Sequence, residues 1–569
     1  MYMEKIADLI KTAVKTEFNI DTEPTVTISD EHGDFSTNIA MQLSKQLGKS
    51  PMEIAEKLIN HLTNRPSNHL TAEVAAPGFI NISVSAKWLS DNLNESWSDN
   101  YGENSDGAGR TALVEYPSPN IAKPYSVGHL RPGNQGWAAR NLMLATGWKV
   151  ITDNHIGDYG APFGIWVVGF EKFSSDEKLA EGGVYELGRI YTSMKEELLD
   201  EKERGEDKLA ELVQDWLLRL ENGDETAINY HEKFNEISLN HTHTVMKRLG
   251  IFTDYEFPES FYVEQGKAEV QKLLKNNIAI QNPDSSVMVK LDNYGIETPI
   301  LLQKSNGTVL YATTDCATLA FREERWHPDR VIYAVAAEQK FYFEQLFALA
   351  SILDINTELI HMWFGLIDQI YDDGKREKMS SRKGVVLMEE LLDKAEVVAR
   401  QNTKSNDISD DDIRKIALGA IKFTDFSKDR RTNILFDWDS MFSLTGFSGP
   451  YVQYAAVRIN KIIRDNQLTD TPINQPTNYD YEAEKTILKK LIEYPTIIKQ
   501  AADYLEPHRI AQYVYDLARV MNRYYEQTPV ATDDVAELIK IARLELLTKV
   551  SQVFTHGLDI LGIEIPESM

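Results

Sequence analysis

Residues 111–130 read TALVEYPSPNIAKPYSVGHL, and this stretch decides the fold. Its first six residues are apolar enough to predict a buried strand over 111–116. A turn ending in Gly-His follows, then helical periodicity over roughly 128–146 and a second strand-like run at 147–154. A strand, a helix and a strand at this spacing predict a parallel α/β sheet with Rossmann-like architecture.

The chain is long enough for more than one domain, with 569 residues. We expect an α+β module over 1–105 and the α/β domain over 106–430, with a helical and mixed insertion at about 171–310. A helical bundle is expected over 431–569. The Gly-, Ser- and Asp-rich run at 99–110 is the best candidate linker.

Composition narrows the class of protein. Cys316 is the only cysteine, so an internal disulfide and a cysteine-based zinc site within one chain are excluded, and we expect a buried structural thiol. No basic-then-apolar leader and no long apolar run occur, which predicts a cytoplasmic protein without a membrane partner. The net charge of −27 speaks against a polyanion partner, but binding depends on local patches, so an RNA-binding protein of this charge needs basic patches facing the RNA.

The turn at Gly128 has the features of a phosphate-binding site. A helix N-terminus offers unpaired N–H groups and the positive end of the helix dipole. Gly128 lets the backbone approach a nucleotide closely, and His129 supplies an imidazole donor. A Gly-His pair alone is more often part of a surface or core, so this interpretation depends on the whole stretch 118–130.

A second run, KMSSRKG at 378–384, follows an acidic turn at 372–374. Lysines on a mobile loop can close over a triphosphate and neutralise the negative charge that gathers on its α-phosphate during transfer. In isolation such a run is more often a solvated loop. Its pairing with the turn at Gly128 is what favours the functional interpretation.

The two runs together resemble the signatures of class I aminoacyl-tRNA synthetases, and the sequence around them resembles the arginyl-tRNA synthetase family over nearly the whole chain. The resemblance implies that the catalytic residues are His129, Lys123, Lys378 and Ser126, and that ATP is bound by Gly128, His129, Met379, Ser380 and Lys383. Two positions depart from the family pattern. Ser126 stands in place of a histidine, and Ser381 stands in place of a second lysine, for which Lys123 is expected to compensate.

An arginine substrate requires carboxylates, because a planar guanidinium pairs with them bidentately. The resemblance implies that arginine is bound by Glu115, Ser118, Asn120, Tyr311, Asp315 and Gln339. His155 and Asp158 match a family segment and are expected on the floor of the site. Asp315 could instead cap a helix that starts at Cys316. Tyr342 stands where the family usually has a histidine, so no nucleotide role is assigned to it.

Both ends of the chain resemble the family's tRNA-contacting parts. The N-terminal module is expected to contact the outer corner of tRNA, and the C-terminal bundle to bind the anticodon. Exposed Tyr and Arg side chains can stack on splayed bases. The candidates are Tyr451, Tyr454, Arg458 and Arg523, although aromatic residues in a bundle more often belong to its core.

The resemblance implies an arginine–tRNA ligase. Arginine attacks the ATP α-phosphate, and the resulting arginyl group passes to the terminal ribose of tRNA(Arg), with tRNA usually needed for the first step. The expected partners are L-arginine, tRNA(Arg) and ATP, which brings Mg²⁺. We expect a monomer with no DNA partner, no prosthetic group and no bound structural metal. Ser126 and Tyr342 leave an alternative open, a non-catalytic tRNA-binding paralogue.

Overall fold

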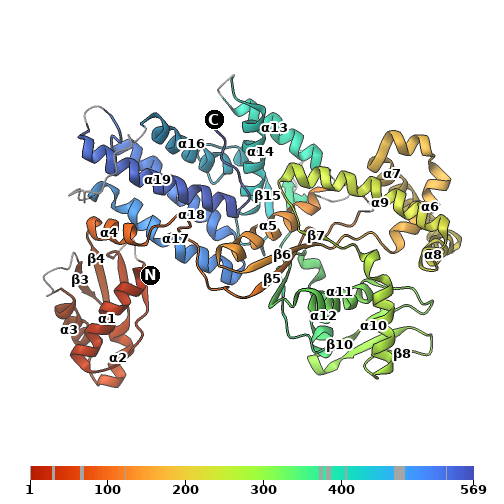
Figure 1. Cartoon of the computed structure of the whole chain (residues 1–569), viewed down its shortest axis with the longest axis horizontal. Helices are drawn as coiled ribbons and strands as arrows, with labels where there is room; N and C mark the ends of the chain where they lie inside the picture. Colours follow the sequence, from red (N-terminus) through yellow and green to blue (C-terminus); the bar gives the residue numbers. More distant parts are fainter. Residues whose placement is uncertain are drawn as a thin grey trace. The chain divides into compact units, whose positions relative to one another are not determined.

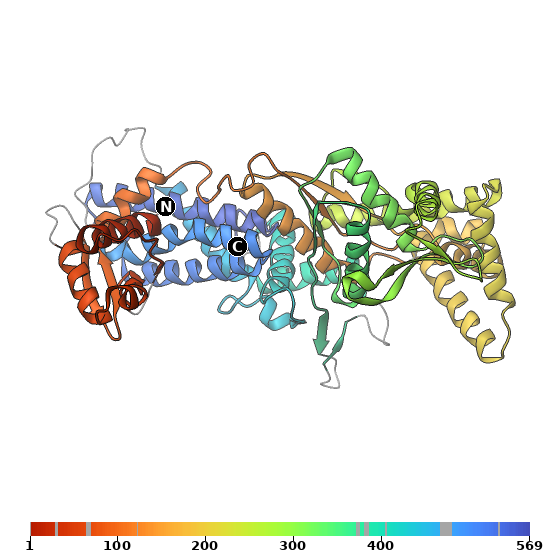
Figure 2. The same ribbon diagram turned by 90° about the horizontal axis from the view of Figure 1, so that it is seen from below.

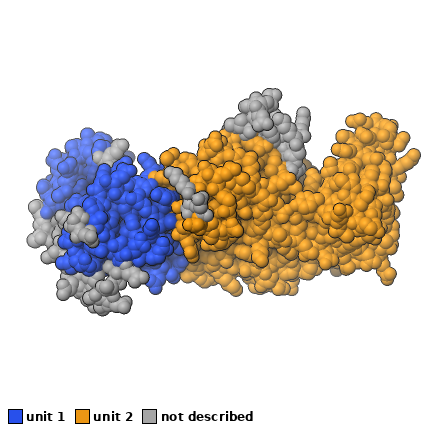
Figure 3. All heavy atoms as spheres, turned by 90° about the horizontal axis from the view of Figure 1, so that it is seen from above, with its two compact units in different colours: residues 1–103, 454–499, 513–556 blue, residues 104–453, 500–512, 557–569 orange. Residues whose placement is uncertain are grey.

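The computed structural model describes residues 2–28, 32–63, 70–121, 123–370, 376–379, 386–403, 407–466, 481–532 and 535–569. These residues form two compact units (Figure 3). Unit 1 contains 1–103, 454–499 and 513–556, and unit 2 contains 104–453, 500–512 and 557–569. No helix of the described residues is long and apolar enough to cross a membrane.

The centre of unit 2 is a parallel sheet, as the sequence predicts (Figure 1). Its strands, in spatial order, are β12 (Glu358–His361), β11 (Arg330–Tyr333), β5 (Thr111–Glu115), β6 (Lys149–Asn154) and β7 (Tyr255–Glu256). The chain leaves β5, crosses through α5 (Leu130–Ala145) and enters β6 on one side, whereas β11 lies on the other side. The strand order therefore reverses at β5, and ligands of open α/β sheets bind at such a point.

Burial explains why residues 111–145 take this form. Ala112, Leu113 and Val114 are fully buried, as expected for a strand covered on both faces. A Cβ atom at Gly136 would lie 2.3 Å from the Cβ of Tyr116, so this glycine lets α5 approach the end of β5. Pro132 falls in the first turn of α5, where its missing N–H costs nothing.

Two groups of elements are inserted between β6 and β11. The first is a helical cluster made of α6 (Ala161–Phe173), α7 (Asp176–Glu203), α8 (Lys208–Glu221) and α9 (Glu225–Leu249). The second is an antiparallel sheet of β8 (Ile280–Gln281), β9 (Val287–Leu291) and β10 (Ile296–Gln303), whose core includes side chains from α10 (Val263–Lys275), α11 (Tyr311–Trp326) and α12 (Lys340–Ile352). Cys316 is buried in that core, which confirms the expected structural thiol.

Two sequence-based expectations about helices are wrong. Helix α11 begins at Tyr311 and not at Cys316, so Asp315 lies inside the helix and does not cap it. The expected bundle over 431–569 is not helical throughout, because β15 (Ile434–Phe436) follows α14 (Asp410–Asp425) and pairs with β13 (Ile367–Ile370). A three-residue strand is too short to show a periodic pattern, so only its partner identifies it.

Unit 1 joins an α+β module to helices of the C-terminal bundle, which together with the parallel sheet confirms the expected fold class. The module consists of α1 (Tyr2–Phe18), α2 (Ile39–Leu47), α3 (Pro51–Thr63), α4 (Ala86–Ser96) and an antiparallel sheet of β1 (Val26–Ile28), β2 (Phe35–Thr37), β4 (Phe79–Val84) and β3 (Leu70–Ala75).

The bundle helices that contribute to unit 1 are α16 (Gly449–Asp465), α17 (Lys485–Tyr504), α18 (His508–Gln527) and α19 (Glu537–Ile560). The last three lie side by side in both views (Figures 1 and 2). Ring contacts join them, since the Tyr494 ring lies 5.0 Å from the Tyr513 ring and 5.7 Å from the His556 ring.

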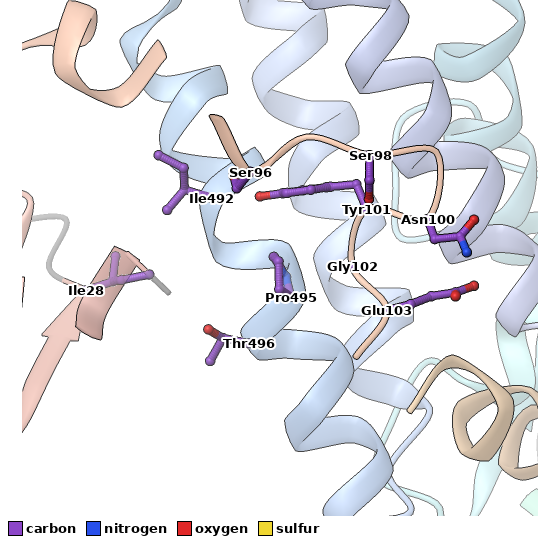
Figure 4. Close-up of a pocket in the computed structure, with 10 residues that line it drawn as sticks. All are labelled: Ile28, Ser96, Ser98, Asn100, Tyr101, Gly102, Glu103, Ile492, Pro495 and Thr496. Carbon is purple, nitrogen blue, oxygen red and sulfur yellow. The ribbon is translucent and has the colours of Figure 1, made fainter. Parts of the chain in front are cut away.

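Part of the expected linker is packed against α17 within unit 1 (Figure 4). Pro495 lies inside α17 and has no N–H to offer the Leu491 carbonyl, which instead accepts a hydrogen bond of 2.9 Å from the Tyr101 hydroxyl. Tyr101 stacks on Trp97 with 4.3 Å between ring centroids. Gly102 has φ +107°, and a Cβ atom there would lie 2.6 Å from the Tyr494 ring.

Gly102→Ala should destabilise the protein more than Gly109→Ala. Both glycines have a positive φ, but a Cβ atom at Gly109 meets nothing within 4 Å. An alanine in this backbone conformation costs about 1–2 kcal/mol of folding free energy at either position. At Gly102 alone, overpacking against Tyr494 adds roughly 1–3 kcal/mol. Thermal unfolding of the two variants measures the difference, and equal midpoints would contradict the close contact.

Candidate active site

A cavity of about 470 Å³ lies in unit 2 at the carboxyl ends of β5 and β11. It brings together all six residues expected to bind arginine and two expected at the phosphate turn: Glu115, Ser118, Asn120, Tyr311, Asp315, Gln339, Gly128 and His129. These eight residues come from four separate stretches of sequence, and the stretches that follow β5 and β11 meet because parallel strands present their carboxyl ends at the same edge of the sheet.

A second cavity of about 190 Å³ shares Gly128 and His129 with the first, and Met379 also lines it. The two distant signatures thus meet at one place. Lys378 is the last residue of β14 (Arg376–Lys378), where it pairs with Asp368 of β13, but its side chain lies outside the described part of the structure. Ser380 and Lys383 also lie outside the described residues.

Backbone hydrogen bonds hold both flanks of the second signature. The Met379 N–H donates to the Ile367 carbonyl at 2.9 Å, and both residues line the smaller cavity, which also contains Gly128 and His129. On the other flank, the Val127 N–H donates to the Val386 carbonyl at 3.0 Å, and the Met388 N–H donates to the Tyr125 carbonyl at 3.0 Å. The segment that precedes α13 (Met388–Asn402) is therefore paired directly with the turn that carries His129.

A buried carboxylate holds α5 against the rest of the unit. Asp425 of α14 accepts from the Arg131 Nε at 2.8 Å and from the side-chain amides of Asn134 and Gln135 at 3.2 and 3.1 Å. The Arg131 guanidinium also donates to the Gly365 carbonyl at 2.7 Å, beside the cavity lined by Met379. The position of the turn that carries Gly128 and His129 therefore depends on these hydrogen bonds to Asp425.

His129 has one ring nitrogen committed to the backbone. The Ser126 N–H donates to its Nδ1 at 3.1 Å, so Nδ1 is the acceptor and the proton of the neutral ring is on Nε2. Burial lowers the pKa of His129 to about 4, so the ring is neutral at pH 7. A neutral imidazole with a free Nε2–H is a hydrogen-bond donor and not a cation.

Two other expected catalytic residues lie between β5 and α5. Ser126 is half-buried and pairs with Leu387 through its backbone. Lys123 is exposed, with its Nζ 5.4 Å from the centroid of the Tyr191 ring. Neither side chain is among the described residues that line the two cavities.

The buried acids around the large cavity divide into two groups. Arg322 of α11 forms an ion pair with both Glu115 and Asp153, each at 2.7 Å. Asp158 accepts from the Ser260 N–H at 2.9 Å and from the Asn235 side chain at 3.0 Å. These hydrogen bonds join the segment after β6 to η2 and to α9. Asp315 and Glu259 remain, and both line the cavity.

Within the described residues, neither Asp315 nor Glu259 forms an ion pair with a lysine or arginine. Burial raises the pKa of Asp315 to about 7. Burial, and then the charge of Asp315, raise the pKa of Glu259 well above its usual value. A buried carboxyl group and a half-buried one that repel each other favour a cationic ligand between them.

Glu259 lines the cavity but was not predicted from the sequence. It follows β7 in the short helical turn η2 (Glu259–Tyr262), and its N–H donates to the Ile156 carbonyl at 2.9 Å, which ties it to the segment after β6. Residues 256–310 have a mixed pattern without a motif, so no local signal marks this acid. His155, expected on the floor of the site, does line the cavity.

The four residues expected to contact tRNA lie on two helices. Tyr451, Tyr454 and Arg458 are on α16 and Arg523 is on α18. Tyr454, Arg458 and Arg523 are exposed, whereas Tyr451 is half-buried. The Arg458 guanidinium lies 4.5 Å from the Tyr525 ring centroid, so its position is set by a cation–π contact.

Three family models match successive parts of the chain. They are "tRNA synthetases class I (R), catalytic domain" over 96–438, "DALR anticodon binding domain" over 452–569 and "Arginyl tRNA synthetase N terminal domain" over 4–84. Among solved structures, the arginyl-tRNA synthetase of Thermus thermophilus matches with a TM-score of 0.80 and 24% identity, covering 100% of both chains. The methionyl-tRNA synthetase of Mycobacterium tuberculosis matches with a TM-score of 0.52 over 80% of this chain and 92% of that chain, at 9% identity.

The fold and the site thus define a class I aminoacyl-tRNA synthetase. Curated relatives narrow the class. The arginine–tRNA ligase of Fusobacterium nucleatum is 32% identical over 99% of both chains, and that of Alcanivorax borkumensis is 31% identical over 100% of both. The chain belongs to the arginyl-tRNA synthetase family and is an arginine–tRNA ligase. Enzymes of this family use ATP and bind arginine and tRNA, so the expected enzyme is confirmed and the non-catalytic paralogue is not favoured.

Arg131→Met should lower the free energy of unfolding by about 3–5 kcal/mol, because it leaves the carboxylate of Asp425 buried without its cation. Arg189→Met is the control, since its ion pair with Glu186 involves an arginine side chain that is 47% exposed and should cost less than about 1 kcal/mol. Denaturant unfolding of both variants makes the comparison. Similar losses would show that the Asp425 cluster is not the constraint described here.

Proposed function

We propose that the 470 Å³ cavity binds the side chain of arginine between Asp315 and Glu259. The observation that carries this proposal is that these two cavity-lining carboxyl groups have no lysine or arginine partner among the described residues, whereas Glu115 and Asp153 share Arg322. A guanidinium placed between them relieves their repulsion and pairs with planar acceptors. Tyr311 and Gln339 border the same space.

The α-amino and carboxylate end of arginine then lies toward Glu115, Ser118 and Asn120, beside the phosphate turn. This orientation directs the substrate carboxylate to the cavity shared by Gly128 and His129, where ATP binds with its Mg²⁺. The carboxylate oxygen attacks the α-phosphorus, the bond to the bridging oxygen breaks, and pyrophosphate leaves. In the second step the terminal ribose hydroxyl of tRNA(Arg) attacks the acyl carbon, and AMP leaves.

The side chains near the phosphates act by electrostatic stabilisation. His129 donates through Nε2 to the α-phosphate, Gly128 and Met379 border the nucleotide, and Ser126 orients the histidine through its own backbone N–H. Lys123, Lys378, Ser380 and Lys383 supply donors and positive charge to the departing pyrophosphate. No prosthetic group takes part in these steps.

The remaining assignments follow from the family and the exposure of the side chains. Tyr451, Tyr454, Arg458 and Arg523 contact the anticodon arm, and the N-terminal module contacts the outer corner of tRNA(Arg). We retain the division into 1–105, 106–430 and 431–569, with a cytoplasmic monomer as the working form. DNA and membranes are not partners in this scheme.

Asp315→Asn should raise the KM for arginine by about 100-fold and change the KM for ATP by less than about threefold, because a cation loses its charged partner. The control is Glu324→Gln, which removes one negative charge from an exposed position on the same helix. Both variants are compared in tRNA-dependent ATP–pyrophosphate exchange. An equal rise in the two KM values would refute the arginine-binding role, and a panel of amino acids in this assay tests the substrate itself.

His129→Ala should lower kcat for arginine activation by about 10²–10³-fold, as expected for the loss of one donor to a developing charge. The KM for arginine should change little, because the ring lies on the nucleotide side of the cavity. His243→Ala, at an exposed ion pair with Glu256, controls for the loss of an imidazole. Near-normal turnover would remove His129 from the mechanism.

A further inference from the structure

Asp315 has a neighbour that the reaction scheme above does not use. The hydroxyl of Tyr342, in the first turn of α12, donates to the Asp315 Oδ2. On the other side of the carboxylate, the His155 Nε2 lies 3.8 Å from Oδ1. Tyr342 lines the same cavity as Asp315, so its hydroxyl borders the space proposed for the guanidinium.

We propose that Tyr342 is a positioning and specificity residue for arginine, which holds the Asp315 carboxylate ionised and turned toward the guanidinium. The proposal rests on the proposed function, since it assumes that Asp315 contacts the substrate. A phenol O–H that donates to one carboxylate oxygen restricts rotation of the group and leaves the other oxygen for the ligand. A hydrogen bond to the charged form of an acid also favours that form.

The groups around Asp315 shift its pKa in opposite directions, so the hydrogen bond from Tyr342 affects its charge at neutral pH. Burial raises the pKa of Asp315 to about 7, Tyr342 and Arg322 lower it, and Glu115 raises it. The other titratable groups facing this cluster are Glu259 and Tyr262 of η2, Tyr333 of β11 and His155 after β6.

His155 does not supply positive charge at neutral pH. Burial and the charge of Arg322 lower its pKa to about 4, so its ring is neutral. Arg322 is already shared between Glu115 and Asp153. Without the Tyr342 hydroxyl, Asp315 therefore loses its nearest donor and takes up a proton at a higher pH.

The charge state of Asp315 sets the preference for a cation. An ionised Asp315 attracts a guanidinium, whereas a protonated Asp315 is neutral and distinguishes poorly between arginine and citrulline, whose urea group has a similar shape but no charge. Binding of arginine must therefore weaken as the pH falls through about 7, because a proton competes with the cation for the same carboxylate.

Tyr342→Phe tests the proposal by removing the hydroxyl and keeping the ring. In tRNA-dependent ATP–pyrophosphate exchange at pH 7, we expect the KM for arginine to rise about 10-fold with kcat changed less than about threefold. The pH at which the arginine KM begins to rise should move upward, and inhibition by citrulline relative to arginine affinity should strengthen. Tyr342→His keeps a donor and should restore the KM to within about threefold.

The matched control is Tyr116→Phe, which removes a buried phenol hydrogen bond of 2.8 Å to the Phe252 carbonyl in the same unit. It should leave the pH profile of the arginine KM in place. A structural effect of losing any buried hydroxyl would lower the unfolding temperature of both variants without moving that profile.

The outcomes separate the inference from the proposed function. If Asp315→Asn raises the arginine KM but Tyr342→Phe leaves both the KM and its pH profile unchanged, the role of Tyr342 is overturned and that of Asp315 stands. If Asp315→Asn has no effect, both are overturned. Should Tyr342→Phe fail to fold, Tyr342→Met decides in the same assay, because its flexible side chain fills the space without a hydroxyl. A raised arginine KM with an upward-shifted pH profile supports the inference, and an unchanged KM and profile overturn it.

Discussion

The constraint on which the site depends is the burial of Asp425 beneath α5. A carboxylate without water must be neutralised and fully hydrogen-bonded, and three side chains from one face of α5 meet that requirement: Arg131, Asn134 and Gln135. Arg131 also donates to the carbonyl of Gly365, which precedes β13. Strand β13 pairs with β14, and Met379 directly follows β14. The helix that presents Gly128 and His129 is thereby held to the part of the unit that carries the second signature.

Charge pairing in the large cavity follows a related logic. One internal cation, Arg322, is shared by two acids at the ends of neighbouring strands, Glu115 and Asp153. Arg322 is therefore paired within the protein, whereas Asp315 and Glu259 line the cavity without a lysine or arginine partner among the described residues. Burial raises the pKa of both remaining acids, and a neighbouring carboxylate raises each pKa further: Glu115 for Asp315, and Asp315 for Glu259. A site of this kind is stable when its ligand brings the missing positive charge.

Much of this architecture was predictable from the sequence because it depends on local pattern. The buried strands at 111–115 and 149–154 and the helix between them follow from apolar periodicity, which placed the helix start at about 128, two residues before Leu130. Six residues could be named as candidates for binding arginine because they match family motifs, and all six line one cavity. The start of α11 and the strand β15 were missed, since a helix start without a polar N-cap and a three-residue strand give weak local signals.

The sequence by itself determined the family, the parallel sheet and the residue types that a phosphate and a guanidinium require, because these are properties of short contiguous segments. Only the tertiary structure decided which charges cancel. The ion pairs of Arg322 join residues that are far apart in the chain, Glu115 and Asp153. The cavity likewise brings together Tyr342, Asp315 and Glu259, which are also distant in sequence. No periodic pattern reveals which of these acids have an internal cation as partner and which do not. The physical reason is that electrostatic energy depends on distance and burial in space, which chain folding sets, and not on separation along the sequence.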